Sequence, residues 1–136
     1  MAGDDEAQQV VNEFIAAVNA RDLKRLAQLM TEDHSFTDAT GSVHSGRDTV
    51  LADWKKFFET FAKYQIQVDT VLAKDGVVAA FGWAVGSAQA DARTGRSKSW
   101  RISAAWKAVV KKKAIAEWQV CCDIEPLLRS TGSQRW

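Results

Sequence analysis

The sequence predicts an α+β domain in which three helices come first and a meander of long strands follows. Up to Phe61, apolar residues recur mostly at intervals of three and four, the spacing of amphipathic helices. Beyond Lys63 the apolar period falls to two, which is typical of strands with one buried face. A curved sheet with helices on its concave face encloses a cavity, so this order of elements also predicts a pocket.

Two helices are expected at the start of the chain. The first covers residues 7–20, where one stripe contains the apolar residues Val10, Val11, Phe14, Ile15 and Val18. Asp22, in the following turn, can cap a second, shorter helix that extends from Leu23 to Met30.

A short strand and a bend are predicted between the second and third helices. Residues 34–38 alternate between polar and apolar, and Gly41 supplies a turn before Val43. Ser45 and Asp48 have the spacing of an N-cap and its capping acid. The third helix that they introduce carries one apolar face, made of Val50, Leu51, Trp54, Phe57, Phe58 and Phe61.

Four strands are predicted in the second half of the chain. The first two, 66–72 and 77–85, flank the hairpin signal Asp75-Gly76. The third has Trp100, Ile102, Ala104 and Trp106 on one face and Arg101, Ser103 and Lys107 on the other. The last covers 115–123, after a lysine turn that we interpret as a solvated hairpin tip. We therefore expect one domain over 1–136, with its core at 7–127 and a polar tail at 128–136.

Composition argues against several classes of partner. The net charge is +1, which gives no general attraction for nucleic acid or an anionic membrane. No apolar run approaches the length of a membrane span, and the first residues are acidic where a signal peptide is basic, so a cytoplasmic location is expected. The adjacent Cys121 and Cys122 should be reduced thiols, because a bond between strand neighbours is strained. No cofactor is expected.

Several segments of the chain resemble SnoaL-like polyketide cyclases and bacterial ketosteroid isomerases, members of the nuclear transport factor 2-like superfamily. The similar segments are 10–23, 36–41, 45–47 and 115–118, with Asp123 following. The resemblance implies a cone-shaped fold, with three N-terminal helices on a strongly curved, mainly antiparallel sheet, and a homodimer formed through the outer face of that sheet. It does not specify a reaction, because the superfamily includes isomerases, cyclases, dehydratases, epoxide hydrolases, transport factors and assembly domains.

The residues that match the isomerase site are only partly retained. The general base of that family corresponds to Asp38, but the tyrosine that holds the enolate oxygen corresponds to Phe14, which has no hydroxyl. The protonated aspartate of a late strand has no counterpart between Ala92 and Ala116, where Ser103 is the nearest polar substitute. Since each such donor typically contributes about two to three powers of ten in rate, steroid isomerisation itself is not expected.

Asp38 is the leading candidate for a catalytic residue, with two interpretations open. In an aromatic pocket its pKa would rise and it could act as a general base; at the start of the Ala39-Thr40-Gly41 turn it would cap backbone amides and its pKa would fall. His34, on the same face, could orient or protonate the acid, or be a half-exposed residue at a helix-to-strand junction. His44 is a weaker candidate. A metal site built from these three residues lacks a spacing signature.

We expect a pocket for a flat, mainly apolar molecule. Its predicted lining residues are Phe14, Phe36, Trp54, Phe58, Phe61, Trp83, Ser103, Trp106, Trp118, Val120 and Cys122. Ordinary core packing also explains each aromatic residue. Arg101 has two open interpretations, pairing with an acid and a subunit contact, and Asp123 is best interpreted as a cap of the turn at Pro126.

Two functions follow: a cofactor-independent isomerase, cyclase or dehydratase that uses Asp38, or a non-catalytic binding or assembly domain.

Overall fold

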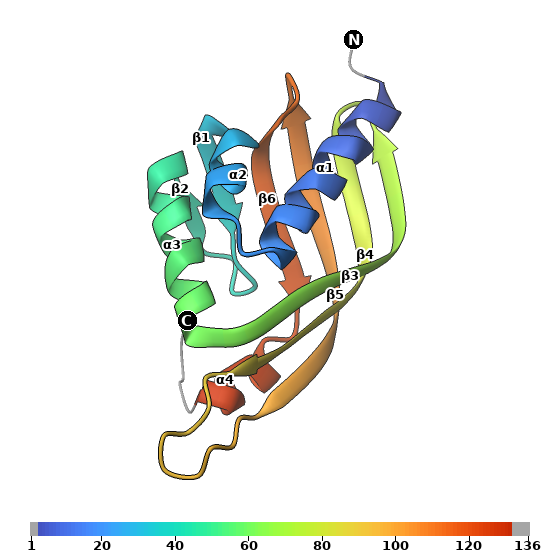
Figure 1. Ribbon diagram of the computed structural model, residues 1–136. Coiled ribbons are helices and arrows are strands. Elements are labelled where there is room, and N and C mark those ends of the chain that lie inside the picture. The colour runs from blue at the N-terminus through green and yellow to red at the C-terminus, as the bar shows by residue number, and fades with distance from the viewer. Residues whose placement is uncertain (1–2, 132–136) are drawn as a thin grey trace.

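The computed structural model describes residues 3–131 and consists of three helices packed on one face of a six-stranded sheet, with a fourth helix at one end (Figure 1). The helices are α1 (Asp4–Asn19), α2 (Leu23–Gln28), α3 (Arg47–Thr60) and α4 (Glu125–Thr131). The strands are β1 (Met30–Thr37), β2 (Val43–Ser45), β3 (Phe61–Lys74), β4 (Val77–Ala88), β5 (Ser99–Lys111) and β6 (Ala114–Cys122). This confirms the predicted α+β class and element order.

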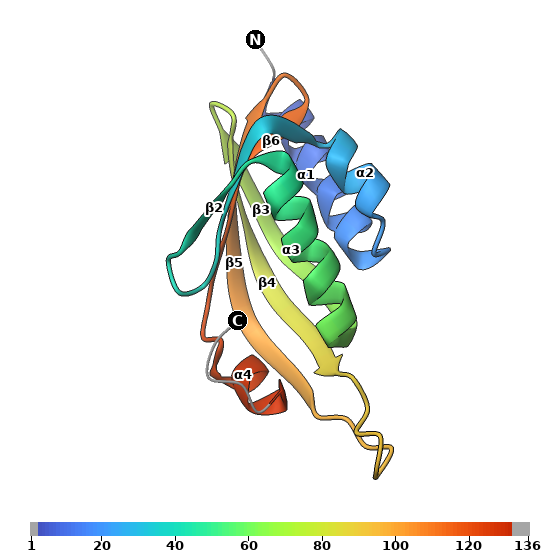
Figure 2. The ribbon, with the colours of Figure 1, turned by 90° about the vertical axis from the view of Figure 1, so that its left-hand side faces the viewer.

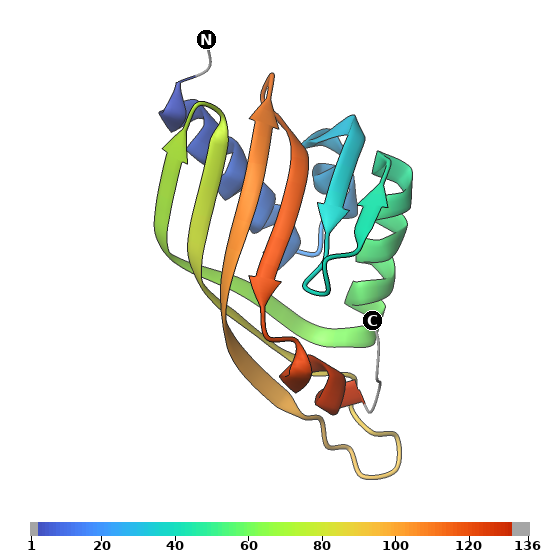
Figure 3. The same cartoon turned by 180° about the vertical axis from the view of Figure 1, so that it is seen from behind.

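The sheet has the strand order β2-β1-β6-β5-β4-β3. Its pairs are antiparallel except for β1 with β6, which run parallel. A parallel pair needs a long crossover, and here residues 38–113, with α3 among them, separate the two strands. Helices α1, α2 and α3 lie on one side of it (Figure 2), and the opposite face is free of them (Figure 3). The N-terminal helices therefore cover only the inner face of the sheet.

Two glycines of β4 allow the long strands to bend. The register of β3 against β4 shifts between Val68 and Thr70, next to Gly82. A Cβ on Gly82 would lie 1.9 Å from the backbone oxygen of Gln67, so only glycine permits this close approach. A Cβ on Gly86 would lie 2.7 Å from the ring of Trp100, which packs in the space that the glycine leaves. The bend in β3, β4 and β5 produces the concave face on which the helices pack (Figure 2).

Strand alternation decides which side chains enter the core. Along β5, Trp100, Ile102, Ala104 and Trp106 are buried, as predicted. On β6, Trp118 is 1% exposed and its ring centroid lies 4.6 Å from that of Phe14 on α1. The contact joins the first helix to the last strand, so the two ends of the predicted domain close a common core.

Three predicted boundaries are wrong. The second helix ends at Gln28, and Met30 already belongs to β1, where it pairs with Ile115. Ser45 does not cap α3, because it is held in β2 opposite Ser35; the N-cap is Gly46, whose φ of 95° suits a glycine. Phe61 begins β3.

The chain after β6 also differs from the predicted polar tail. Residues 125–131 form α4, and Leu127 is buried against the core. Asp123 Oδ1 accepts a hydrogen bond of 3.0 Å from the Glu125 amide, which confirms Asp123 as a cap. The remainder of the predicted tail, 132–136, lies outside the described residues.

Replacing Trp118 with alanine should destabilise the fold by about 3–5 kcal/mol, because it empties a fully buried site beside Phe14. Urea denaturation followed by circular dichroism would measure the loss. Trp83→Ala, at a half-buried position on the outer face, is the matched control and should cost less. Equal losses for the two variants would contradict the central role of Trp118.

Candidate functional site

The Asp38 carboxylate caps the turn that joins β1 to β2. Its Oδ1 atom accepts hydrogen bonds from the Thr40 amide at 2.9 Å, the Thr40 hydroxyl at 2.5 Å and the Ser42 amide at 3.1 Å. Asp and Gly at its ends favour this turn. The Asp38 amide also donates a hydrogen bond to the Ser42 carbonyl. The side chain is 7% exposed. Three donors therefore already occupy one oxygen of the candidate base.

His44 occupies the other oxygen of Asp38. Its Nε2 lies 2.9 Å from Asp38 Oδ2, and its Nδ1 lies 3.0 Å from Asp53 Oδ2 on α3. When protonated, the imidazolium donates to Asp38 and forms an ion pair with Asp53, so it connects the β1–β2 turn to α3. The His44 side chain is 32% exposed. Sequence reasoning ranked His44 below His34 and did not consider Asp53, because the pairing depends on how α3 packs beside β2.

This arrangement fixes the direction of both pKa values. Burial acts to raise the Asp38 pKa, but the hydrogen bonds from Thr40, His44 and Ser42 outweigh it and hold the pKa below its ordinary 3.8. The hydrogen bond to Asp38 raises the His44 pKa above 6.5, and Asp53 adds to the effect. The structure therefore contradicts the expected rise in the Asp38 pKa and favours the turn-capping interpretation.

His34 is fully buried and is not a partner of Asp38. Its Nδ1 lies 2.7 Å from the Ile115 carbonyl oxygen, so Nδ1 carries the proton and donates it. Burial lowers the His34 pKa and keeps the ring neutral. The Nε2 atom is consequently an acceptor, and it has no hydrogen-bond partner among residues 3–131. The half-exposed junction histidine of the sequence interpretation is therefore wrong.

The concave face is lined by two adjoining groups of aromatic rings. In the first, Phe14 contacts His34, Trp54 and Trp118, and Phe36 contacts Trp54 and His44. In the second, Phe57 and Phe61 contact each other, and Trp100 contacts Phe61 and Tyr64. Trp54 joins the groups through Phe57 and Phe58. Sequence reasoning placed Phe57 and Trp100 on inner faces but did not include them, or Tyr64, in the pocket.

The other predicted lining residues divide between the two faces. Trp106 is buried on the inner face, and Val120 and Cys122 pack partly buried against the same core. Burial raises the pKa of the free Cys122 thiol to about 11, which leaves it a poor nucleophile at neutral pH.

Trp83 and Ser103 do not line the interior. Trp83 pairs with Ser103 across β4 and β5, and alternation turns both to the outer face. There the Arg101 guanidinium lies 3.6 Å from the Trp83 ring centroid. Arg101 therefore makes a cation-π contact with an aromatic ring, where the sequence had suggested an acidic partner.

Two further buried nitrogens on the concave face lack a partner. The indole Nε1 atoms of Trp54 and Trp100 are buried, and neither has a hydrogen-bond acceptor in the described part of the chain. Together with His34 Nε2 they give an interior with two donors and one acceptor that the protein itself does not satisfy. Native proteins pair the large majority of such atoms, so these three need an explanation.

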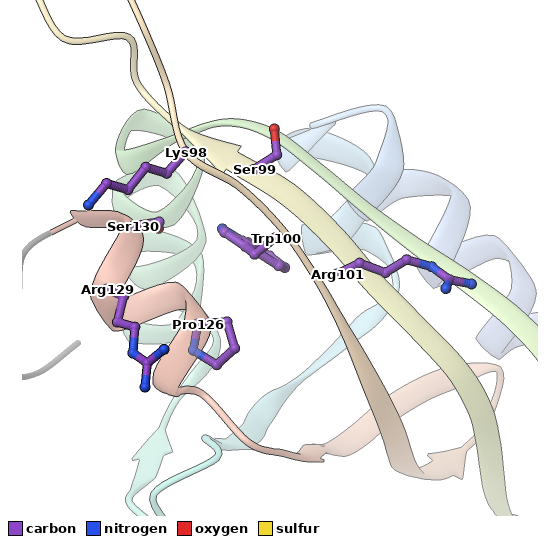
Figure 4. Close-up of a pocket in the computed structure, with 7 residues that line it drawn as sticks. All are labelled: Lys98, Ser99, Trp100, Arg101, Pro126, Arg129 and Ser130. Atoms are coloured by element: carbon purple, nitrogen blue, oxygen red, sulfur yellow. The ribbon is translucent and has the colours of Figure 1, made fainter.

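One cleft lies between β5 and α4 (Figure 4). It has a volume of about 500 Å³ and is lined by Lys98, Ser99, Trp100, Arg101, Pro126, Arg129 and Ser130. A smaller cleft of about 270 Å³ lies at the start of α3 and is lined by Glu32, Gly46, Arg47, Asp48 and Thr49. Asp38 and His34 line neither cleft.

Residues 3–131 contain neither a cluster of metal ligands nor a helix that could span a membrane. No group of three or more His, Cys, Asp and Glu side chains within that range is placed to hold a metal ion. Nor is any helix in the range long and apolar enough to cross a membrane.

Comparison with known proteins identifies the family and the fold. The SnoaL-like domain family matches residues 11–118. A proposed polyketide cyclase of Xanthomonas campestris superposes with a TM-score of 0.84 at 14% identity, covering 96% of this chain and 99% of that one. A nuclear transport factor 2-like protein of Burkholderia xenovorans gives 0.75 at 22% identity, covering 95% and 98%.

A third solved structure bears a small molecule. It is a Catenulispora acidiphila protein with a ketosteroid isomerase-like fold, in complex with trimethylamine, and it gives a TM-score of 0.74 at 16% identity, covering 91% of this chain and 92% of that one. At these identities the likeness establishes the fold alone. Among curated proteins, none matches the sequence significantly.

The free energy of unfolding should depend on pH through the Asp38 and His44 pair. The direction of each pKa shift sets the sign of that dependence. The raised His44 pKa stabilises the fold below pH 6.5, and this contribution is lost as pH rises through the raised value. The lowered Asp38 pKa stabilises above pH 3.8 and is lost as pH falls through the lowered value. The stability difference between the parent and His44→Gln should therefore shrink as the pH rises from 6.5 through the raised His44 pKa.

Proton NMR of the two imidazoles would measure the His44 midpoint directly, and His44→Gln assigns the signals. Asp53→Asn should lower that midpoint, because it removes one of the two carboxylates. A His44 midpoint at or below 6.5 in the parent protein would contradict the bridged geometry.

Proposed function

The chain belongs to the SnoaL-like domain family, and on that premise we propose that it is a single-domain protein that binds a small, largely apolar molecule against its aromatic concave face. The ligand would carry a few polar atoms on a flat apolar body. Ligand sites are typically apolar hollows with a small number of placed polar groups, and the curved sheet of this chain supplies the apolar wall.

The unpartnered ring nitrogens of His34, Trp54 and Trp100 are the observation that carries this proposal. Leaving a buried polar group unpaired costs about 1–3 kcal/mol, so an interior with three such groups is more stable when a bound molecule pairs with them. Trp54 and Trp100 would donate to a carbonyl or ether oxygen, and His34 Nε2 would accept from a hydroxyl. Phe14 lies against two of these three residues, with its ring centroid 6.3 Å from His34 and 6.5 Å from Trp54.

Binding is favoured over catalysis because Asp38 is already engaged. A general base needs an oxygen within reach of the substrate proton, and both Asp38 oxygens hold hydrogen bonds within the chain. Its lowered pKa also makes it a weaker base at neutral pH.

A second candidate is a cofactor-independent isomerase, cyclase or dehydratase that uses Asp38. One observation favours it: His44, bonded to Asp38, is 32% exposed and could pass a proton between Asp38 and a substrate. In that mechanism the imidazolium would release Asp38 as the substrate enters, and Asp38 would take a proton from a carbon next to a carbonyl group. His34 would have no part in the proton transfer, because burial keeps its ring neutral and its Nδ1 proton is donated to the Ile115 carbonyl.

A panel of aromatic ketones, steroids and polyketide-like phenols should contain compounds that raise the melting temperature. At a ligand concentration about 100 times the dissociation constant, binding adds about 2.7 kcal/mol of stability. Asp38→Asn should bind as the parent does, because the Asn oxygen still accepts from the Thr40 and Ser42 amides. No stabilising compound in the panel would contradict the binding proposal. Conversion of a compound by the parent, lost in Asp38→Asn, would establish the enzyme instead.

We further propose that two chains associate through the outer face of the sheet. This face carries Phe81, which is 44% exposed, next to the stacked Trp83 and Arg101. A large apolar side chain beside an arginine stacked on tryptophan is a composition enriched in protein interfaces. The N-terminal helices leave this face open (Figure 3).

Sedimentation should therefore give a dimer of the 15.0 kDa chain at tens of micromolar, with an interface of at least about 1,000 Å². Phe81→Arg should shift the equilibrium to monomer, because two-fold symmetry would place added positive charge near Arg101 of both copies. Val43→Arg changes an apolar residue on β2 that is 63% exposed and should leave the dimer intact. A parent protein that sediments only as monomer would contradict the interface.

A further inference from the structure

We propose that the cleft between β5 and α4 binds the acidic end of an apolar ligand, with Trp100 as the donor at its inner end and Lys98 and Arg129 at its rim. This inference rests on the proposed binding function and specifies the chemistry of the ligand: a flat apolar body that ends in a carboxylate or a similar anion. The cleft volume of about 500 Å³ lies within the range of small-molecule sites.

Trp100 connects the cleft with the aromatic interior. It lines the cleft, yet it is only 7% exposed, and its ring contacts Phe61 and Tyr64. In Figure 4 the indole nitrogen is at the end of the ring that faces α4. That nitrogen is buried and has no acceptor among the described residues, so it is an unused donor at the end of the ring nearest α4. An oxygen of a ligand placed in the cleft would satisfy it.

The charges around the cleft select an anion. The residues that line it within the described chain include three cations, Lys98, Arg101 and Arg129, and no acid. Glu125, on α4, is ion-paired with Arg129 at 2.5 Å and leaves the net charge of the rim positive. A negative group is therefore attracted to this cleft although the whole chain carries a net charge of only +1.

The three cations have different roles. Figure 4 shows the Lys98 and Arg129 side chains on the α4 side of the cleft and the Arg101 side chain extending away from α4. Arg101 is held on the outer face by its stack on Trp83, so it contributes charge without reaching the ligand. Arg129 has donors left after one nitrogen pairs with Glu125. Ser130 already donates its hydroxyl to the Leu127 carbonyl. Lys98 and Arg129 are consequently the direct partners of the anion.

The bend in β4 makes this site possible. Gly86 leaves room for the Trp100 ring, since any Cβ there would lie 2.7 Å from it. The ring is thereby held flat against β4, and its nitrogen edge is left toward α4. The side chain that divides the cleft from the aromatic interior is thus fixed by backbone geometry, and the apolar body of a ligand in the cleft would lie against the Trp100 ring.

Two matched probes test the inference: 2-naphthoate, which carries a carboxylate, and 2-acetylnaphthalene, a neutral ketone of the same shape. Calorimetry should show that the parent protein binds 2-naphthoate at least about tenfold more tightly, a difference of about 1.4 kcal/mol. Lys98→Gln and Arg129→Gln should each remove most of this preference, and salt should weaken it. Lys111→Gln, at the far end of β5, is the control for loss of a positive charge and should change nothing.

The indole N–H signal of Trp100 gives a readout at the site itself. Trp100→Phe keeps an aromatic ring and assigns the signal by its loss, and in the parent protein 2-naphthoate should shift that signal. If Trp100→Phe fails to fold, the lysine and arginine variants still decide the question. Equal affinity for both probes, or a preference that survives Lys98→Gln and Arg129→Gln, would overturn the anion site and leave the binding function standing. Failure of both probes and of the whole panel would overturn both proposals.

Discussion

The packing of the Phe14 ring is the contact on which the arrangement of layers depends. Phe14 is fully buried on α1, and its ring lies against His34 of β1, Trp54 of α3 and Trp118 of β6. One side chain thus joins the first helix to the third helix and to the parallel strand pair β1 and β6. The same position corresponds to the hydroxyl donor of the ketosteroid isomerases. In this chain it supplies apolar packing, and the polar chemistry of the interior comes from other residues.

The polar atoms of the interior are ring nitrogens, because the carboxylate at the matching position is hydrogen-bonded to the backbone of its own turn. Asp38 organises the turn after β1 and, through His44, links that turn to Asp53 on α3. The same network lowers the pKa of Asp38 and removes its free oxygen atoms from substrates. A retained residue type at a retained position therefore does not carry the reaction with it; hydrogen bonding decides its chemistry.

The two faces of the sheet carry different kinds of side chain. Alternation along β5 sends Trp100 inward, where its ring lies between the interior and the α4 cleft, and sends Arg101 outward onto Trp83. The inner face is therefore aromatic and covered by helices, whereas the outer face carries Arg101, Trp83 and the exposed Phe81. Gly82 and Gly86 permit this arrangement, because the bend at these residues makes one face concave and the other convex.

The sequence by itself determined the class, the order of the elements and the inner face of β5, because apolar periodicity reflects which side chains must leave water. It also identified Asp123 as a cap, since an Asx turn is a local event. It did not decide which face of β4 is concave, so Trp83 could not be placed outside. For Ser103 the alternation of β5 already gave the answer, because it puts Ser103 on the face opposite Trp106, and including both in the pocket was inconsistent.

Only the tertiary structure decided the pKa of Asp38, the bridge from His44 to Asp53 and the cleft beneath α4. Each depends on groups from separate elements: β1 with β2 and α3, or β5 with α4. A pKa and a binding cleft are properties of distances between such groups. Those distances are set when the helices pack on the curved sheet. No local pattern of residues predicts that packing.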